Sequence, residues 1–125
     1  MKAILDKISE IESVLNYKAA NDFKDLEDYE LDKPVTIENN IIVKKIEQFK
    51  HLVRMIVTVP PKASFNSHIH TYLECIKVLS GTLKDDSKQI TATYDNTIIY
   101  SRGEPHKPYN PSTSQDCILL IDFYK

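Results

Sequence analysis

From Pro34 onward the sequence is a series of short segments rich in β-branched residues and separated by polar turns, and this pattern restricts the fold most strongly. Because no helical periodicity lies between the segments, the pattern favours an antiparallel sandwich or barrel and argues against a doubly wound α/β fold. Residues 84–88 and Asp95-Asn96 are the clearest hairpin connections, since Asp and Asn tolerate a left-handed backbone. The expected strands are Ile41–Val43, Leu52–Val59, Tyr72–Leu79, Ile90–Tyr94, Thr97–Tyr100 and Cys117–Tyr124.

The sequence before Pro34 has a different pattern. Between residues 2 and 19, apolar side chains recur at intervals of four, three and four residues, which places them on one stripe of an α-helix. They are Ile4, Ile8, Ile11 and Leu15. Residues 22–33 form an acidic connector, expected to be a solvated segment that can hold a short second helix. We therefore predict an N-terminal helix and connector over 1–33, packed on a β-barrel domain over 34–125.

Length and charge limit the functions that are open to this chain. A length of 125 residues fits one domain with a modest core, and 16 basic against 18 acidic residues argue against a nucleic acid partner. The longest apolar runs have only a few residues, far fewer than the roughly 20 that span a bilayer. No hydrophobic targeting core follows Met1, and the two cysteines, Cys75 and Cys117, are too few for a disulfide framework. We therefore expect no membrane association and a cytoplasmic location.

A cluster of possible metal ligands lies just before the third expected strand and within it. Side chains along a strand alternate between its two faces, so His68, His70, Tyr72 and Glu74 point the same way. Two imidazoles and a carboxylate on one inward face are costly to bury unless a divalent metal supplies the compensating charge. His106, in a loop after another strand, is available as a fourth ligand.

These residues resemble the two motifs of the cupin superfamily. The first motif has two histidines one residue apart, then three residues, a glutamate, six residues and a glycine; the second has a glycine, two residues, a histidine, three residues and an asparagine. The matching residues are His68, His70, Glu74 and Gly81 in the first motif and Gly103, His106 and Asn110 in the second. The resemblance covers about residues 52–124, and departures such as Asp95 and Ser101 fall at turn positions. It implies a cupin jelly roll whose metal ligands are His68, His70, Glu74 and His106.

Such a ligand set permits catalysis. Three histidines and one carboxylate leave about two of six octahedral positions open on iron, manganese or nickel, whereas tetrahedral zinc would be saturated. We therefore expect one divalent metal ion (Fe, Mn, Ni or Zn) and a small-molecule substrate. The chemistry permits a metalloenzyme of the dioxygenase, isomerase or decarboxylase type that acts on an oxygen-bearing metabolite. The alternative is a non-catalytic module that binds a small molecule or a sugar.

Two further residues are candidates for substrate contact. Tyr72 lies on the ligand face and can donate its phenol to a bound molecule, or it is a wall aromatic whose hydroxyl is satisfied by water. Arg102 flanks His106 in the loop at the expected mouth, where a cation can anchor a carboxylate, although surface solvation is the competing interpretation. The same alternatives apply to Lys107 and Arg54, and Asp122 is a candidate acid or base if it faces the barrel interior.

The opposite face of the Tyr72–Leu79 segment is apolar, because Leu73, Cys75 and Leu79 alternate with the ligand residues. A face of this kind has to be covered by the N-terminal helix or by a second subunit. We favour the helix, with a dimer as a further layer. Small cupins commonly dimerise, so the resemblance also implies a homodimer.

Overall fold

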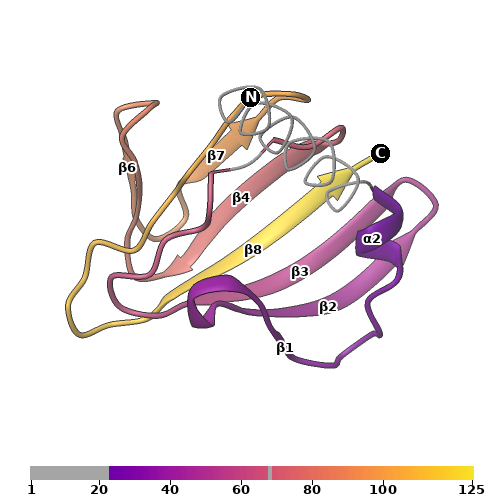
Figure 1. Cartoon of the computed structure of the whole chain (residues 1–125), viewed down its shortest axis with the longest axis horizontal. Coiled ribbons are helices and arrows are strands. Elements are labelled where there is room, and N and C mark those ends of the chain that lie inside the picture. Colours follow the sequence, from indigo (N-terminus) through magenta and orange to yellow (C-terminus); the bar gives the residue numbers. More distant parts are fainter. Residues whose placement is uncertain (1–22, 68) are drawn as a thin grey trace, which may run out of the picture.

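A computed structural model describes residues 23–67 and 69–125, so the expected N-terminal helix and His68 lie outside the described residues. The described chain is mostly antiparallel β-structure with one short helix, which confirms the predicted all-β fold (Figure 1). Its helical elements are α2 (Phe23–Glu27) and the 3₁₀ turn η1 (Glu38–Asn40). Its strands are β1 (Val35–Thr36), β2 (Ile42–Phe49), β3 (Leu52–Val59), β4 (Leu73–Ser80), β5 (Leu83–Asp85), β6 (Ile90–Ala92), β7 (Thr97–Tyr100) and β8 (Cys117–Tyr124).

Six strands form one sheet in the order β1-β2-β3-β8-β4-β7, and β5 pairs with β6 in a separate hairpin. The last strand, β8, lies between β3 and β4, as Figure 1 shows, so the two halves of the sheet are joined only when the C-terminal residues pair. Ile121 of β8 lies opposite Met55 on one side and Ile76 on the other. Sheet formation therefore depends on contacts between segments that are far apart in the sequence.

The core follows from the alternation of side chains along β3 and β8. On these strands every second residue is buried, and the residues between them are half-exposed. The most deeply buried members are Val53, Val57, Val59, Cys117 and Leu119. This period of two confirms the expected pattern of a sheet with one face in the core.

β3, β7 and β8 have the predicted bounds, whereas β6 ends at Ala92 instead of Tyr94. β2 runs over eight residues instead of three, because Lys44, Lys45, Glu47 and Gln48 continue the pairing with β3 although they interrupt the apolar pattern. β1 and β5 were not predicted, and β4 begins at Leu73 instead of Tyr72. A hairpin turn joins β5 and β6 but lies at residues 86–89, since Lys84 and Asp85 belong to β5. The Asp95 turn is present, and Asp95 has a positive φ of 70°.

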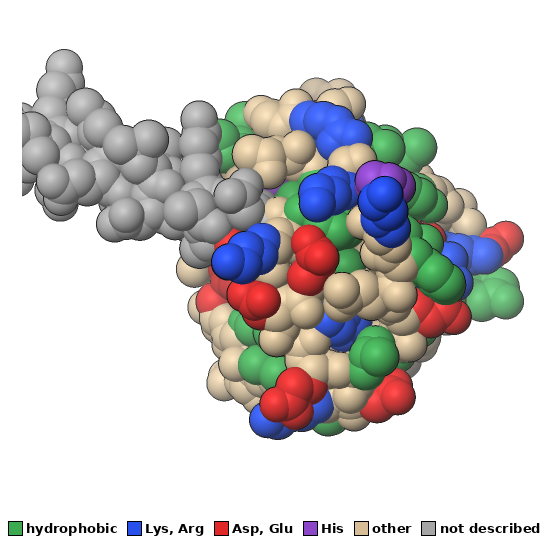
Figure 2. Space-filling view, turned by 90° about the vertical axis from the view of Figure 1, so that its right-hand side faces the viewer, with side chains coloured by type: hydrophobic (Ala, Val, Ile, Leu, Met, Phe, Trp, Pro, Cys, Tyr) green, Lys and Arg blue, Asp and Glu red, His purple; other side chains and the backbone are tan. Residues whose placement is uncertain are grey.

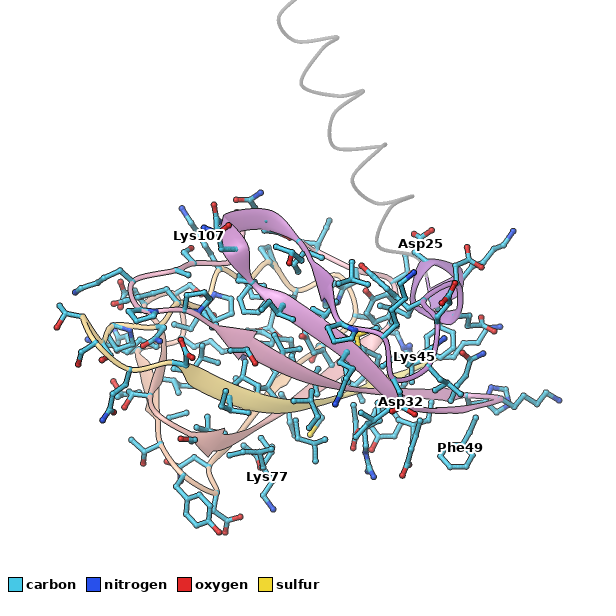
Figure 3. The ribbon with its side chains drawn as sticks, turned by 90° about the horizontal axis from the view of Figure 1, so that it is seen from below. Asp25, Asp32, Lys45, Phe49, Lys77 and Lys107 are labelled. Atoms are coloured by element: carbon cyan, nitrogen blue, oxygen red, sulfur yellow. The ribbon has the colours of Figure 1, made fainter. Side chains whose placement is uncertain are left out.

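The acidic connector contains the short helix α2, whose Phe23 and Leu26 are buried. Lys45 of β2 fixes the end of this helix: it is 2% exposed, and its ammonium donates to the main-chain oxygens of Leu26 (3.3 Å) and Glu27 (2.8 Å). Figure 3 shows Lys45 on the sheet beside α2. A buried lysine thus ties the connector to the barrel through carbonyl groups that a helix end leaves without helical partners.

The outer face of β4 is partly exposed, as predicted: Leu73, Cys75 and Leu79 are half-buried, and Ile99 of the neighbouring β7 is 54% exposed. The helix expected to cover this face lies outside the described residues. On the side of the molecule shown in Figure 2, acidic and basic side chains are interspersed. No helix within residues 23–67 and 69–125 has the length and hydropathy needed to cross a membrane.

Candidate metal centre

Three of the four predicted ligands meet inside the barrel. His70, Glu74 and His106 are 5%, 4% and 3% exposed, and one potential ligand atom from each lies within 4.8 Å of the others. The Glu74 Oε2 atom lies 3.2 Å from His70 Nε2 and 2.9 Å from His106 Nε2. The fourth predicted ligand, His68, is outside the described residues. The sequence motifs therefore converge on one buried cluster of two imidazoles and a carboxylate.

The sheet and one loop contact bring the two motifs together. Glu74 is the second residue of β4, where it lies opposite Tyr100 of β7 and Phe123 of β8. The Gly103 N–H donates to the carbonyl of His70 over 2.8 Å, which ties the second-motif loop to the first-motif segment. Gly103 has a φ of +73°, a conformation that glycine adopts at little cost.

The orientation of His106 is fixed by its own loop. Its Nδ1 atom lies 3.0 Å from the carbonyl oxygen of Glu104, an acceptor, so Nδ1 carries the proton in the neutral ring. Nε2 is then the nitrogen that faces Glu74. The imidazole also stacks on Tyr100, with ring centroids 4.0 Å apart and planes inclined by 19°. His106 is therefore preorganised to bind a metal through Nε2.

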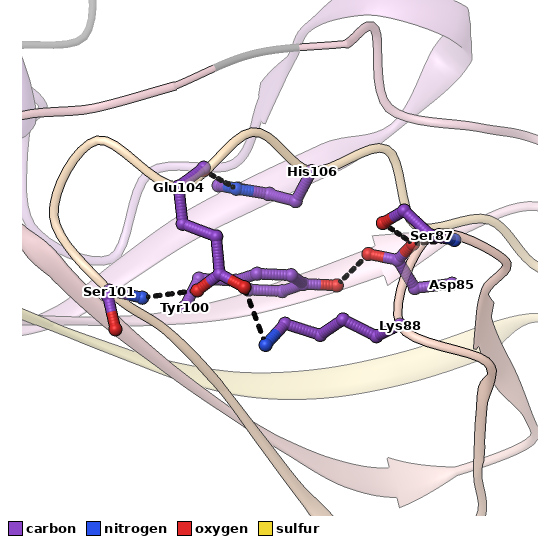
Figure 4. A network of polar contacts seen from close by, with 7 residues as sticks. All are labelled: Asp85, Ser87, Lys88, Tyr100, Ser101, Glu104 and His106. Atoms are coloured by element: carbon purple, nitrogen blue, oxygen red, sulfur yellow. Dashed lines mark hydrogen bonds and ion pairs between the residues drawn. The ribbon is translucent and has the colours of Figure 1, made fainter.

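Beneath His106 lies a polar network that the sequence did not reveal (Figure 4). The buried Tyr100 hydroxyl donates to the Asp85 carboxylate, which also accepts from the Ser87 main-chain N–H (2.9 Å) and hydroxyl (2.6 Å). Burial raises the pKa of Asp85, but the hydrogen bonds from Ser87 and Tyr100 lower it by more, so the pKa lies below its ordinary value. Burial, together with Asp85, raises the pKa of Tyr100, which keeps its proton.

A salt bridge between Lys88 and Glu104 holds the loop that carries His106. Lys88 Nζ lies 2.6 Å from Glu104 Oε1, and the Ser101 N–H donates to Glu104 Oε2 over 2.8 Å. Glu104 is the residue whose carbonyl faces His106, so the ion pair holds the segment that orients the ligand. Figure 4 shows the Glu104 side chain running past the Tyr100 ring to reach Lys88.

Asn110, the last residue of the second motif, has a structural role. It is fully buried, and its side-chain nitrogen lies 2.8–3.2 Å from three carbonyl oxygens, while its side-chain oxygen accepts a main-chain N–H. The carbonyls belong to Val59, Pro60 and Gln115, and the N–H belongs to Ser112. The amide therefore joins the end of β3 to the chain that enters β8 and satisfies groups that would otherwise be buried without partners.

A cavity of about 310 Å³ adjoins the ligand cluster. Tyr72 lines it with His70 and Glu74, as the alternation of side chains predicts, and is 2% exposed. Its ring stacks on that of His70, with centroids 4.3 Å apart, and meets the edge of Phe123 at 5.3 Å. Tyr72 is thus a rigid wall of the cavity, immediately beside a predicted ligand.

The structure does not bring Arg102 to this cavity. Arg102 is exposed and its guanidinium lies 3.5 Å from the main-chain oxygen of Tyr124, at the end of β8. Lys107 is also exposed. Arg54 pairs with Asp122 across β3 and β8, with Nε 2.7 Å from one carboxylate oxygen and Nη2 3.0 Å from the other. The sequence places these cations near motif residues, but the strand register turns Arg54 and Asp122 toward each other on the half-exposed outer face.

The donor set fits a divalent metal. A buried carboxylate faces two imidazole nitrogens, and all three groups are of types that bind transition metals. His70 and Glu74 line the cavity, so a small molecule in the cavity can reach the cluster. His70, Glu74 and His106 are therefore suited to hold a metal ion.

Comparisons with known proteins agree with this fold. Residues 55–123 match the family model described as "Cupin domain". Among curated proteins, none matches the sequence. A chain of the complex between SigE and the anti-sigma ChrR of Rhodobacter sphaeroides superposes with a TM-score of 0.66 and 19% identity. That match covers 73% of this chain and 49% of the other, so this chain spans about half the length of that neighbour.

Two further solved structures have similar folds. The polyketide cyclase RemF of Streptomyces resistomycificus has a TM-score of 0.65 and 21% identity, over 74% of this chain and 72% of the other. A "predicted oxalate decarboxylase" of Thermotoga maritima has a TM-score of 0.64 and 19% identity, over 74% and 91%. At these identities the comparisons establish the shared fold.

Proposed function

The chain belongs to the cupin domain family, and from this premise we propose that it is a metal-dependent enzyme acting on a small oxygen-bearing metabolite. One observation carries the proposal: His70, Glu74 and His106 converge, buried, and the first two line a cavity of about 310 Å³. His68 is proposed as the fourth ligand, on the spacing of the first motif. The proposed reaction is of the dioxygenase, isomerase or decarboxylase type.

The residues of the cavity have separable roles in this proposal. His70, Glu74 and His106 would hold one divalent ion of iron, manganese, nickel or zinc, which when bound acts as a Lewis acid toward a substrate oxygen. Tyr72 would donate a hydrogen bond to the substrate beside them. Arg102 is left out of the proposed site because it contacts the end of β8 instead of the cavity.

The apolar lining of the cavity favours a reaction from which bulk water is excluded. Aliphatic and aromatic side chains make up most of the lining, including Met55, Val57, Phe65 and Phe123. In such surroundings, hydrogen bonds and charges act more strongly on a bound molecule than they do in water. A small, mostly apolar cavity with a few polar groups is typical of a site that orients a substrate.

Metal analysis tests the proposal. Protein purified without added metal is examined for bound metal by mass spectrometry, together with His70→Ala, His106→Ala and the control His51→Ala, since His51 is exposed on the turn between β2 and β3. We expect both site variants, and not the control, to lose most of the metal. Unchanged metal content in both site variants would overturn the assignment.

Turnover tests the enzymatic part. The metal-loaded chain is assayed for product formation and oxygen uptake with keto acids, hydroxy acids, thiols and sugars. Metal-dependent turnover supports an enzyme, whereas ligand binding without turnover across the panel favours the non-catalytic binding module. A homodimer and a cytoplasmic location remain predictions from the sequence.

A further inference from the structure

We infer that the outer sheet face binds a second copy of this chain, so that two sheets pack face to face about a two-fold axis. The outer sheet face is the side of the six-stranded sheet that points away from the cavity. Its central apolar side chains are Ile56, Cys75, Leu79, Ile99, Ile118 and Leu120. The inference concerns a different surface from the proposed metal site and does not depend on it.

The outer sheet face is apolar across neighbouring strands. On β3, β8 and β4, the residues that alternate with the buried core positions are half-exposed or exposed. Strand pairing places Leu120 of β8 between Ile56 of β3 and Lys77 of β4. It also places Cys75 of β4 beside Ile99 of β7. These side chains therefore form one continuous surface, and exposed apolar surfaces of this kind mark interaction sites.

Side chains at the rim enlarge this surface. Among the residues that the structure describes, six large hydrophobic side chains are exposed, and four of these belong to the outer sheet face: Ile42, Phe49, Ile99 and Tyr124. Phe49 and Tyr124 both lie opposite Leu52 in the strand register, one on each side of it. The most exposed apolar groups of the described chain are thus concentrated on one side of the sheet.

The charges of this face are largely paired within the chain. The Arg54 guanidinium binds the Asp122 carboxylate through Nε (2.7 Å) and Nη2 (3.0 Å), and these two side chains are 32% and 16% exposed. Lys77 Nζ lies 2.9 Å from Asp95 Oδ1. Lys44 stands near the edge of the sheet, where its long stem lets the ammonium reach solvent. An identical apolar face can therefore cover these pairs without breaking them, and no strong field of one sign selects a highly charged partner.

The width of the face favours a second sheet over a single helix. The five neighbouring strands from β2 to β7 span about 19 Å between the outermost strand axes, and an eight-residue strand is about 26 Å long. The outline of about 500 Å² underestimates the accessible surface, because side chains stand out from the pleated sheet, so the face approaches the roughly 800 Å² that each partner of a stable interface buries. A helix is about 10–12 Å across, so the predicted helix over 2–19 would cover about half of this width.

The place where the described chain begins also favours a second copy. Phe23 packs on the cavity side, where its ring meets that of Tyr72 edge-on with centroids 6.1 Å apart. Figure 3 shows Asp25 of α2 on one side of the sheet, and Phe49 and Lys77 on the other. The first described residues therefore lie on the side opposite the outer sheet face.

Sedimentation velocity on the full chain tests the inference. We expect a dimer at about 10 µM. A two-fold axis introduces every substitution twice, so Leu120→Glu brings two carboxylates to the centre of the interface and Ile99→Glu brings two to its edge. The dimer dissociation constant should rise at least about 30-fold for the first and about tenfold for the second. Because Ile99 is 54% exposed, its substitution leaves the fold of one chain intact, which circular dichroism checks.

Leu31→Glu is the matched control. Leu31 is an equally exposed apolar residue (56%), but it lies on the connector beside Lys45, whose side chain is buried on the other face of the sheet. The substitution adds the same charge away from the proposed interface. It should leave the dissociation constant unchanged.

Cys75 gives a second measurement that needs no substitution. It is half-buried on the outer sheet face opposite Asp122 and Ile99, whereas Cys117 is fully buried in the core and serves as the internal reference. A second copy would cover Cys75. N-ethylmaleimide at fixed concentration should therefore label Cys75 several-fold more slowly in the dimer than in the diluted, monomeric chain, as mass spectrometry can measure.

The double variant Ile8→Glu/Ile11→Glu tests the other occupant, the predicted N-terminal helix, in the full chain. It places charges on the apolar stripe of that helix and should leave the dimer unchanged. A parent chain that dimerises only in this variant, or a dimer that the variant abolishes, would assign the face to the helix or the interface to the N-terminal residues. Either result would overturn the inference.

Three further outcomes would also overturn it. They are a monomeric parent chain at about 100 µM, a dimer that neither Leu120→Glu nor Ile99→Glu weakens, and a Cys75 labelling rate that is the same in monomer and dimer. The labelling result stands even if Leu120→Glu fails to fold, because it is obtained with the parent chain.

Discussion

Replacing Tyr100 by phenylalanine removes one hydroxyl from the centre of the network beneath His106. Tyr100 is fully buried and donates to Asp85, which is 1% exposed. The phenylalanine ring keeps the stacking contact with His106, so the change is confined to one donor of a buried carboxylate. We expect the variant to fold, to retain the metal site and to be less stable.

The size of the loss follows from the kind of hydrogen bond. A hydrogen bond to a charged group contributes about 1.5–3 kcal/mol, and the two donors of Ser87 remain in the variant, so we expect a loss of about 2 kcal/mol at pH 7. The pKa of Asp85 is lowered in the folded state, so its ionised form stabilises the fold above the unfolded pKa of roughly 4. This contribution disappears as pH falls through the folded pKa. Below that pKa the carboxyl is neutral, and the difference should shrink to about 1 kcal/mol.

Urea unfolding followed by circular dichroism, at pH 7 and in steps down to the lowest pH at which the parent chain is folded, measures how the difference changes. A chelator is present throughout, because a metal bound to the native state would add its own stabilisation. Tyr94→Phe is the control, since Tyr94 is 74% exposed, and its stability should equal that of the parent chain. A loss below about 0.5 kcal/mol at pH 7 would refute the role assigned to the Tyr100–Asp85 bond.

Four further predictions follow from other parts of the fold. Tyr72→Phe should keep metal content and stability but reduce turnover, and unaffected turnover would remove Tyr72 from the mechanism. Asn110→Ala should lower the free energy of unfolding by about 3 kcal/mol, because four main-chain groups lose a buried partner, and a loss below about 1 kcal/mol would contradict this role. Gly81→Ala should cost about 2 kcal/mol or more in the same unfolding assay, because φ is +81° and the added Cβ would lie 2.6 Å from the Asp116 oxygen; an unchanged midpoint would contradict this. Deleting residues 1–18 should increase self-association in size-exclusion chromatography if they cover the outer face of β4, and an unchanged elution and stability would argue against that packing.

The period of two predicted part of the site correctly. It placed His70, Tyr72 and Glu74 on one side, and the structure gathers all three around the same cavity, although β4 begins only at Leu73. The spacing of the second motif predicted that His106 lies near these residues, and the structure places it beside Glu74. These predictions worked because they depend on local geometry or on a whole motif, each of which is contained in a short stretch of sequence.

The contacts that sequence reasoning missed depend on register between distant segments. Asp85 belongs to a segment interpreted as a polar turn, yet it is the last residue of β5. It is buried on the same side of the strand as Leu83, with the half-exposed Lys84 between them. Its partner Tyr100 is on β7, and only the packing of the β5–β6 hairpin near β7 brings the two together. Arg54 and Asp122 were likewise recognised one by one, and the pairing of β3 with β8 makes them opposite neighbours.

The acidic connector illustrates how a segment outside the two motifs can contribute to the lining of a cavity. Its charge pattern predicts a solvated segment, and most of its acids are exposed or half-exposed. Burial of Phe23 and Leu26 nevertheless holds α2 against the barrel, and Lys45 fixes the end of the helix, so Asp25 lines the cavity. The ligand cluster lies within the residues that match the family model, 55–123, whereas Asp25 and Glu38 precede them. The cavity is therefore lined both by residues of the matched region and by residues that precede it.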